Sequence, residues 1–131
     1  MSVFEWEHFK NLADILGNES SEASQRTAIG RYYYASFGHS RQYLIDDLGK
    51  EEYEDIYDVH NEVINCFLGA FYHDHCLNIG NDLKRLRNSR NKADYNIDFP
   101  TLDESLIIKS KKKANNIFKN IKFLRDHNIS F

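Results

Sequence analysis

The chain has 131 residues, of which 41% are hydrophobic and 28% are charged, and its formal net charge is −3 at pH 7. This length predicts one folded domain spanning residues 1–131, and the composition excludes a disordered or low-complexity chain. The apolar runs are far shorter than the roughly 20 residues that a membrane span needs, and two cysteines are too few for a disulfide scaffold, so we expect a cytoplasmic protein without membrane contact.

The first two predicted elements are helices. Over residues 2–17, apolar side chains recur at intervals of three to four, and Ser2 with Glu5 forms a capping box. The second helix is predicted over residues 21–48, because it opens on two serines that are suitable caps and ends at Gly49. The first residues also lack the basic start of a secretory signal.

The remaining pattern is also helical. Residues 50–58 are acidic and fit either a loop or a short turn of helix. Three further helices are predicted over residues 59–71, 78–95 and 101–126. Phe71 belongs to the expected buried side of its helix, and Thr101 with Glu104 forms a second capping box. Sustained period-two alternation is absent, so the predicted fold class is all-α, a single bundle of four to five antiparallel helices.

The charge is distributed unevenly along the chain. Residues 1–75 carry five basic and fourteen acidic side chains, whereas residues 76–131 carry twelve basic and six acidic ones. This difference points either to an anionic partner for the second half or to attraction between the two halves. The lysines of the last helix fit a phosphate-backbone contact or simply a solvated helix face.

Two segments carry more information than helix packing requires. The first is RYYYASF, which begins at Arg31, and the second is RNKADY, which begins at Arg90. Arg31 and Tyr34 lie three residues apart and share a helix face, and the same spacing relates Arg87 to Arg90. Arginines flanked by a carboxylate and phenols suit phosphate recognition, because a guanidinium group offers forked donors.

Both segments resemble the HEPN superfamily of small helical prokaryotic proteins, in the branch with Arg-x-x-Ala-Asp-Tyr on its late helix. His60 and the apolar stripe after it resemble the middle helix of that branch, and the resemblance covers about residues 21–96. It implies a homodimer without a cofactor. Many HEPN proteins are metal-independent endoribonucleases of toxin–antitoxin or phage-defence systems, so the resemblance also implies this activity. Their composite site contains an arginine and a histidine four to six residues later.

From these residues and the resemblance we expect a site with two groups of side chains. The expected catalytic residues are Arg90, Asp94 and Tyr95. The expected substrate-binding residues are Arg31, Tyr34, Arg87, Asn91 and His60. Tyr95 stands where the family motif has histidine, and tyrosine, with a reference pKa near 10, is a weak base at pH 7. A histidine from another helix, His60 or His39, is the alternative proton-transfer group.

Two functions therefore remain open. The first is a protein that binds or cleaves RNA. The second is a non-catalytic module that partners a nucleotidyltransferase-type protein or an antitoxin, and the missing motif histidine favours it.

Several of these residues also have a structural interpretation. Tyr33 is predicted to be a core aromatic residue. Arg31 is either a phosphate contact or the ion-pair partner of Asp94 that holds the two motif helices together. The sequence HDHC at residues 73–76 completes no four-ligand zinc set, so neither a metal nor another cofactor is expected.

Overall fold

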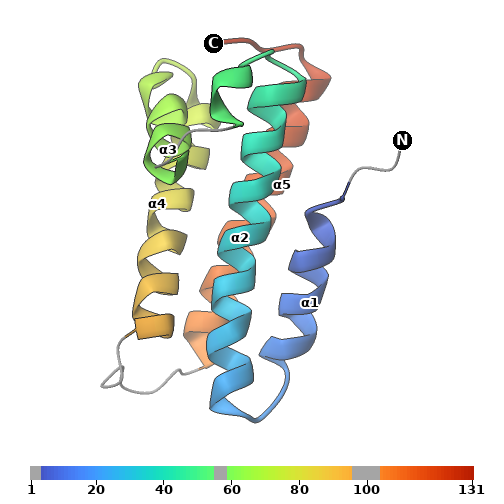
Figure 1. Cartoon of the computed structure of the whole chain (residues 1–131), viewed down its shortest axis with the longest axis vertical. Helices are drawn as coiled ribbons and strands as arrows, with labels where there is room; N and C mark the ends of the chain where they lie inside the picture. Colours follow the sequence, from blue (N-terminus) through green and yellow to red (C-terminus); the bar gives the residue numbers. More distant parts are fainter. Residues whose placement is uncertain (1–3, 55–58, 96–103) are drawn as a thin grey trace.

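The computed structural model describes residues 4–54, 59–95 and 104–131, and these ranges contain helices and no strand. Within these ranges the structure has five α-helices: α1 (Glu7–Gly17), α2 (Glu22–Asp46), α3 (Val59–Gly69), α4 (Asp74–Tyr95) and α5 (Glu104–Asp126). A short 3₁₀ turn, η1 (Glu51–Tyr53), follows α2. The predicted all-α bundle is thereby confirmed (Figure 1).

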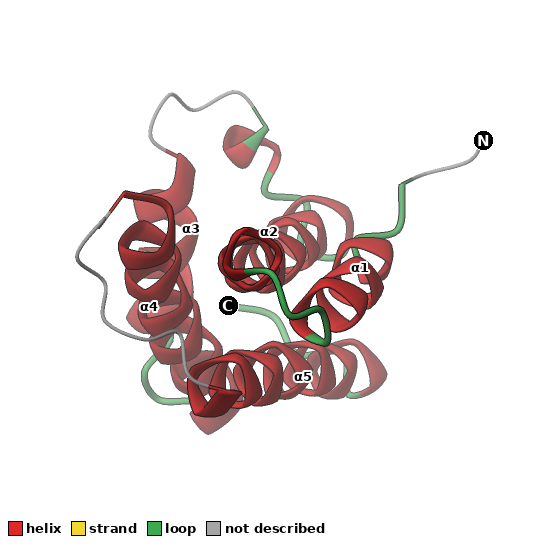
Figure 2. Ribbon diagram, turned by 90° about the horizontal axis from the view of Figure 1, so that it is seen from below, coloured by secondary structure: helices red, strands yellow, loops and turns green. Residues whose placement is uncertain are grey.

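The central element of the bundle is α2. It packs against α1, α4 and α5, while α3 lies mainly on α4 (Figure 2). Because α2 is covered from several sides, its buried residues do not form a single stripe, and many of them are small. The small buried residues of α2 are Ala28, Gly30, Ala35, Ser36, Gly38 and Ser40.

Two glycines allow backbone and side chain to approach closely. A Cβ atom at Gly38 would lie 2.2 Å from the indole ring of Trp6, so the absence of a side chain lets Trp6 lie flat on α2. A Cβ atom at Gly80 would lie 2.7 Å from the side chain of Leu68, so this glycine lets α3 close on α4.

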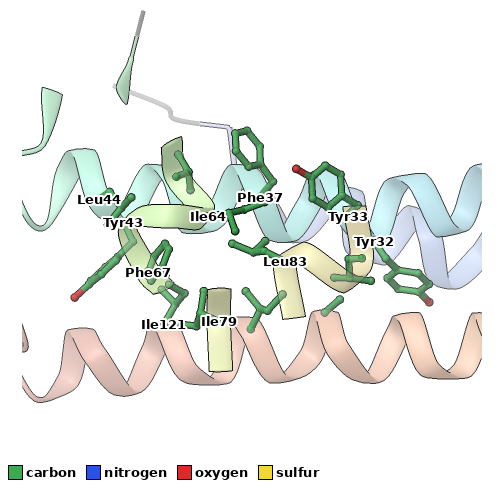
Figure 3. Packing of buried hydrophobic residues seen from close by; sticks show 14 of the residues in the cluster. Tyr32, Tyr33, Phe37, Tyr43, Leu44, Ile64, Phe67, Ile79, Leu83 and Ile121 are labelled. Atoms are coloured by element: carbon green, nitrogen blue, oxygen red, sulfur yellow. The ribbon is translucent and has the colours of Figure 1, made fainter. Parts of the chain in front are cut away.

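The core is rich in large side chains that are fully buried (Figure 3). Each such apolar side chain stabilises the fold by roughly 1.5–3 kcal/mol relative to leaving it exposed. Tyr33 is buried, as predicted. Tyr43 is also buried, and its hydroxyl donates to the carbonyl oxygen of Ile129 at 2.9 Å, which ties the C-terminal segment to α2.

Three helix boundaries were predicted incorrectly. α1 begins at Glu7, after Trp6, and no side chain caps it; Ser2 lies outside the described residues. α3 ends at Gly69, so Phe71 is 70% exposed instead of buried. α4 already begins at Asp74, whose negative charge at the first turn favours a helix start there.

Other boundaries agree with the sequence. The Ser21 hydroxyl caps α2 by accepting a hydrogen bond from the Ser24 N–H at 3.3 Å. Gly49 follows α2 in a left-handed conformation with φ of 68°, which suits glycine. The capping box at Thr101 falls outside the described residues.

Among the described residues, two ion pairs join the acidic and the basic half of the chain. Lys111 Nζ lies 3.7 Å from Asp14 Oδ1, and Arg125 Nε lies 3.0 Å from Asp47 Oδ2. Such partly exposed pairs contribute at most about 1 kcal/mol each, so they support attraction between the halves without dominating stability. Among the described helices, none is both long enough and apolar enough to cross a membrane.

Candidate functional site

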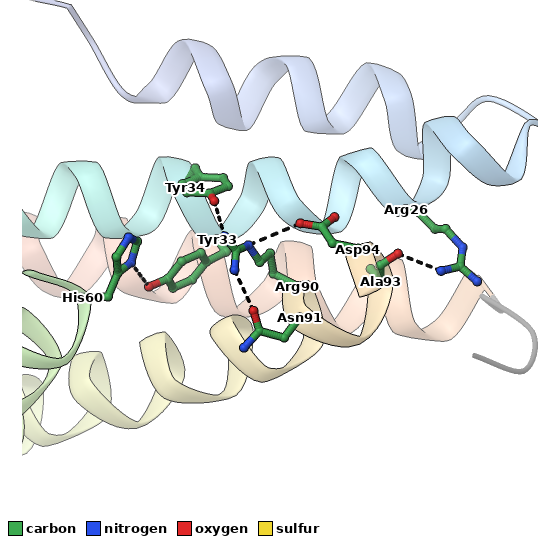
Figure 4. A network of polar contacts seen from close by, with 8 residues as sticks. All are labelled: Arg26, Tyr33, Tyr34, His60, Arg90, Asn91, Ala93 and Asp94. Atoms are coloured by element: carbon green, nitrogen blue, oxygen red, sulfur yellow. Dashed lines mark hydrogen bonds and ion pairs between the residues drawn. The ribbon is translucent and has the colours of Figure 1, made fainter. Parts of the chain in front are cut away.

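The two motif segments meet where α2 crosses α4. Gly30 of α2 lies at this crossing, where a Cβ atom would be 3.8 Å from both Arg90 Cγ and Asp94 Oδ1. Both polar side chains of α4 therefore lie next to the α2 backbone, at a distance where a Cβ atom would make only ordinary van der Waals contact. Figure 4 shows the resulting network of polar contacts.

Arg90 is the centre of this network. Its Nη2 donates to the Tyr34 hydroxyl, and its Nη1 donates to Asn91 Oδ1 at 2.6 Å. Its Nε is buried 3.3 Å from Asp94 Oδ2, in an ion pair that lacks hydrogen-bond geometry. Only 16% of the Arg90 side chain is exposed. Each terminal nitrogen nevertheless keeps one N–H that no described residue accepts.

The surroundings of Arg90 keep it charged. Burial by itself would lower its pKa, but the hydrogen bond to Tyr34 and the negative charge of Asp94 raise the pKa above the ordinary arginine value. Arg90 and Asp94 meet because residues four apart on a helix lie on the same face. The site therefore contains a fixed positive charge whose orientation is set by three partners.

Arg31 is the second cation beside Tyr34. Its Cζ lies 5.8 Å from the centroid of the Tyr34 ring and 5.1 Å from that of Phe9, and Arg90 Cζ lies 5.0 Å from the same Tyr34 ring. Within the described ranges Arg31 forms no ion pair or hydrogen bond. The alternative ion pair between Arg31 and Asp94 is wrong, because Asp94 pairs with Arg90.

His60 joins the site from α3. Its Nδ1 shares a hydrogen bond of 2.6 Å with the Tyr33 hydroxyl, and its ring stacks on Phe37 with centroids 4.1 Å apart. The same imidazole lies edge-on to Tyr34, at 6.3 Å between centroids. His39, the alternative histidine, instead stacks on Phe118 of α5 at 4.1 Å.

Tyr95 and Arg87 differ in how they relate to the site. The Tyr95 ring centroid lies 5.9 Å from Arg90 Cζ, and Tyr95 is 74% exposed. Arg87 turns away, since its Nη1 donates to Asn61 Oδ1 at 2.6 Å in a separate surface hollow. The structure thus brings together the predicted site residues other than Arg87, which lies apart from them and contacts α3.

Sequence reasoning missed the aromatic support of the site. Phe9 lies beneath Arg31 without belonging to either motif, and Phe37, the last residue of RYYYASF, supports His60 of a different helix. Both contacts depend on how helices pack, so the local sequence carried no signal for them. In the described part of the chain, no three His, Cys, Asp or Glu side chains are grouped to hold a metal ion.

Comparisons with known proteins add one relative. No protein-family profile matches the chain, and no solved structure matches it. The chain is similar to an uncharacterized protein of Methanocaldococcus jannaschii, with 34% identity over 98 residues that cover 67% of this chain. The match spans 59% of that relative's length, and the relative's name states no activity.

Proposed function

We propose that this protein is a HEPN-like homodimer that binds RNA, with one RNA phosphate held between Arg31 and Arg90. The observation that carries the proposal is the Arg31 guanidinium, which has no acceptor among the described residues and lies beside the Tyr34–Arg90 hydrogen bond. A guanidinium group with open donors is suited to phosphate, because its forked N–H groups match two phosphate oxygens.

The local charge supports an anion at this position. Arg31 and Arg90 both lie within 6 Å of the Tyr34 ring, and Asp94 neutralises only one of them. One positive charge is left in excess, and a bound anion would neutralise it. Phe9 and Tyr34 hold the Arg31 guanidinium over their rings, which lowers the entropy that the side chain loses on binding.

For RNA cleavage the same site offers His60 as the proton-transfer group. Histidine commonly serves as a general acid or base, because its imidazole group can both accept and donate a proton. The contacts of the His60 ring with Tyr33 and Phe37 fix its orientation next to Tyr34. We therefore assign proton transfer to His60 and not to Tyr95, whose phenol is a weak base at pH 7.

The binding proposal is tested with a fluorescein-labelled single-stranded RNA and fluorescence anisotropy. Arg31→Gln is expected to weaken binding about tenfold or more, because a charge-assisted contact is lost. Arg85→Gln is the matched control, since Arg85 is an exposed arginine of α4 outside the cluster. Equal affinities of the two variants would overturn the assignment of the site.

Cleavage is followed by gel electrophoresis of the same RNA. We expect His60→Ala to abolish cleavage and Tyr95→Phe to retain it, with the helical circular dichroism signal unchanged in both variants. Loss of cleavage in Tyr95→Phe alone would place proton transfer at Tyr95 instead.

A second function is a non-catalytic module that binds a nucleotidyltransferase-type or antitoxin protein. Two observations favour it. Tyr95 is exposed at the end of α4, and the Arg90 guanidinium group already contacts three side chains of the same chain. In this case Tyr95→Ala would remove a complex with the product of a neighbouring reading frame, as measured by size-exclusion chromatography. RNA binding would then be weak and insensitive to Arg31→Gln.

A further inference from the structure

A hollow of about 240 Å³ lies on the surface between α3 and α4, and Arg87 is one of its lining residues. The two helices pack against each other along this side of the bundle (Figure 2). The hollow has no lining residue in common with the Arg31–Arg90 cluster, so it is a separate candidate site.

Helical spacing brings the lining side chains together. The residues of each wall share one helix face, Asn61, Asn65 and Leu68 on α3 and Lys84, Arg87 and Asn88 on α4. The two walls are joined directly, because Arg87 Nη1 donates to Asn61 Oδ1 at 2.6 Å. This hydrogen bond holds the guanidinium group of α4 towards α3, at the boundary between the two helices.

The hollow is positively charged. Its described lining includes two cations, Lys84 and Arg87, and no carboxylate. Lys84 is exposed and forms no ion pair within the described ranges. Arg87 is half-buried and donates from Nη1 alone, so its Nε and Nη2 keep N–H groups that no described residue accepts. A carboxylate matches this arrangement, since guanidinium and ammonium groups form charge-assisted hydrogen bonds with its two oxygens.

The remaining lining residues indicate what lies next to the carboxylate. Ile64 and Leu68 supply aliphatic surface, with Ile64 5% exposed and Leu68 half-buried. The exposed carboxamides of Asn65 and Asn88 each offer a donor and an acceptor, as a peptide backbone requires. None of the described residues that line the hollow is aromatic, so it offers no ring on which a base of RNA would stack. These properties favour a peptide over a nucleic acid.

We propose that this hollow binds the C-terminal residue of a peptide chain, one with an apolar side chain and a free carboxylate. The carboxylate pairs with Arg87 and Lys84, the side chain lies on Leu68, and the preceding peptide group bonds to Asn65 or Asn88. A C-terminal residue suits the site because its carboxylate and its side chain leave the same Cα atom.

The size of the hollow agrees with a chain end. Pockets that enclose a whole small molecule measure roughly 300–1,000 Å³, so 240 Å³ accommodates one end of a longer ligand. An internal aspartate or glutamate would bring a carboxylate but no apolar group for Leu68. Capture of a C-terminal carboxylate is a recurring mode of peptide recognition. This inference is independent of RNA binding at Arg31.

The test uses the full chain and the peptide Gly-Ser-Gly-Ser-Ala-Leu, which carries fluorescein at its N-terminus and a free C-terminal carboxylate. A saturable increase in fluorescence anisotropy is expected as protein is added. The same peptide with a C-terminal amide is expected to bind at least about tenfold more weakly, because the amide carries no charge. A free-acid peptide that ends in glycine is expected to bind about fivefold more weakly, because it lacks the apolar side chain.

Two variants locate the site. Lys84→Gln, at an exposed position, is expected to weaken binding of the free-acid peptide at least about fivefold. Lys92→Gln is the matched control, since Lys92 is an exposed lysine of the same helix outside the hollow, and it is expected to leave binding unchanged. Arg31→Gln is also expected to bind the peptide fully, which separates this proposal from RNA binding.

Several results would overturn the proposal. They are the absence of a saturable signal up to millimolar protein, equal affinities for the free-acid and amide peptides, and equal effects of Lys84→Gln and Lys92→Gln. Loss of peptide binding in Arg31→Gln with full binding in Lys84→Gln would overturn it too, because the carboxylate would then occupy the Arg31–Arg90 cluster. If Lys84→Gln weakened binding of the labelled RNA while the peptide did not bind, the hollow would be part of an RNA contact instead.

Discussion

Replacing Gly80 with alanine tests whether α3, which carries His60, packs on α4 as closely as the structure describes. The added Cβ atom would lie 2.7 Å from Leu68 Cδ2, 2.8 Å from Leu68 Cγ and 3.1 Å from the Leu68 backbone nitrogen. Favourable contacts between carbon atoms lie at about 3.5–4.0 Å. The Leu68 side chain can rotate away, but its backbone nitrogen moves only if α3 shifts.

The size of the effect follows from two opposing terms. Overpacking of this kind destabilises a core by about 1–3 kcal/mol, and the higher helix propensity of alanine offsets up to about 1 kcal/mol. We therefore expect the free energy of unfolding of Gly80→Ala to fall by about 1–2 kcal/mol. For a chain of this length, each kcal/mol lowers Tm by about 4 °C.

Urea unfolding followed by circular dichroism measures this change, and Gly30→Ala is the matched control. A Cβ atom at Gly30 meets its nearest neighbours only at 3.8 Å, so this variant is expected to gain up to about 1 kcal/mol from helix propensity. If Gly80→Ala were as stable as Gly30→Ala, the close packing of α3 on α4 would be refuted.

Three further predictions address the core, the pH dependence and the site. Phe67→Ala removes a fully buried ring and is expected to lower the free energy of unfolding by about 3–5 kcal/mol in urea titrations; a loss below about 1 kcal/mol would contradict its burial. Because burial lowers the folded-state pKa of His39 to about 4, against about 6.5 when unfolded, its contribution to stability is complete above pH 6.5 and is lost as the pH falls towards 4. Tm measured across this range should therefore fall less steeply in His39→Gln than in the wild type, and parallel curves would exclude this role. Tyr34→Phe removes the acceptor of Arg90 Nη2 and should cost about 1 kcal/mol in urea unfolding, whereas no loss would show that water replaces the hydroxyl fully.

Helix boundaries were predictable where a local chemical signal exists. The serine cap at the start of α2 and the apolar spacing of α5 both act within a few residues of the chain. Phe71 was misassigned because it continues the three-to-four spacing after Phe67, although α3 ends at Gly69. Periodicity cannot indicate where the chain leaves one helix to begin the next, since that turn depends on the packing of α3 against α4.

In the site, too, contacts within one helix could be predicted from the sequence, whereas contacts between helices could not. The pairing of Arg90 with Asp94 follows from their spacing of four residues. Arg87 lies on nearly the same side of α4 as Asp94 but one turn before Arg90, where it contacts Asn61 of α3, and residue spacing does not indicate that contact between helices. The contact of Tyr34 with Arg90 joins two helices, so residue spacing alone does not predict it.

The salt dependence of RNA binding tests the proposed phosphate contact at Arg31 most directly. For a single-stranded nucleic acid, each neutralised phosphate contributes about 0.7 to the slope of log K against log salt concentration. We predict that the slope of Arg31→Gln is smaller than that of the wild type by about 0.7, and that Arg85→Gln keeps the wild-type slope. An unchanged slope in Arg31→Gln, or the same decrease in both variants, would contradict a phosphate bound at Arg31.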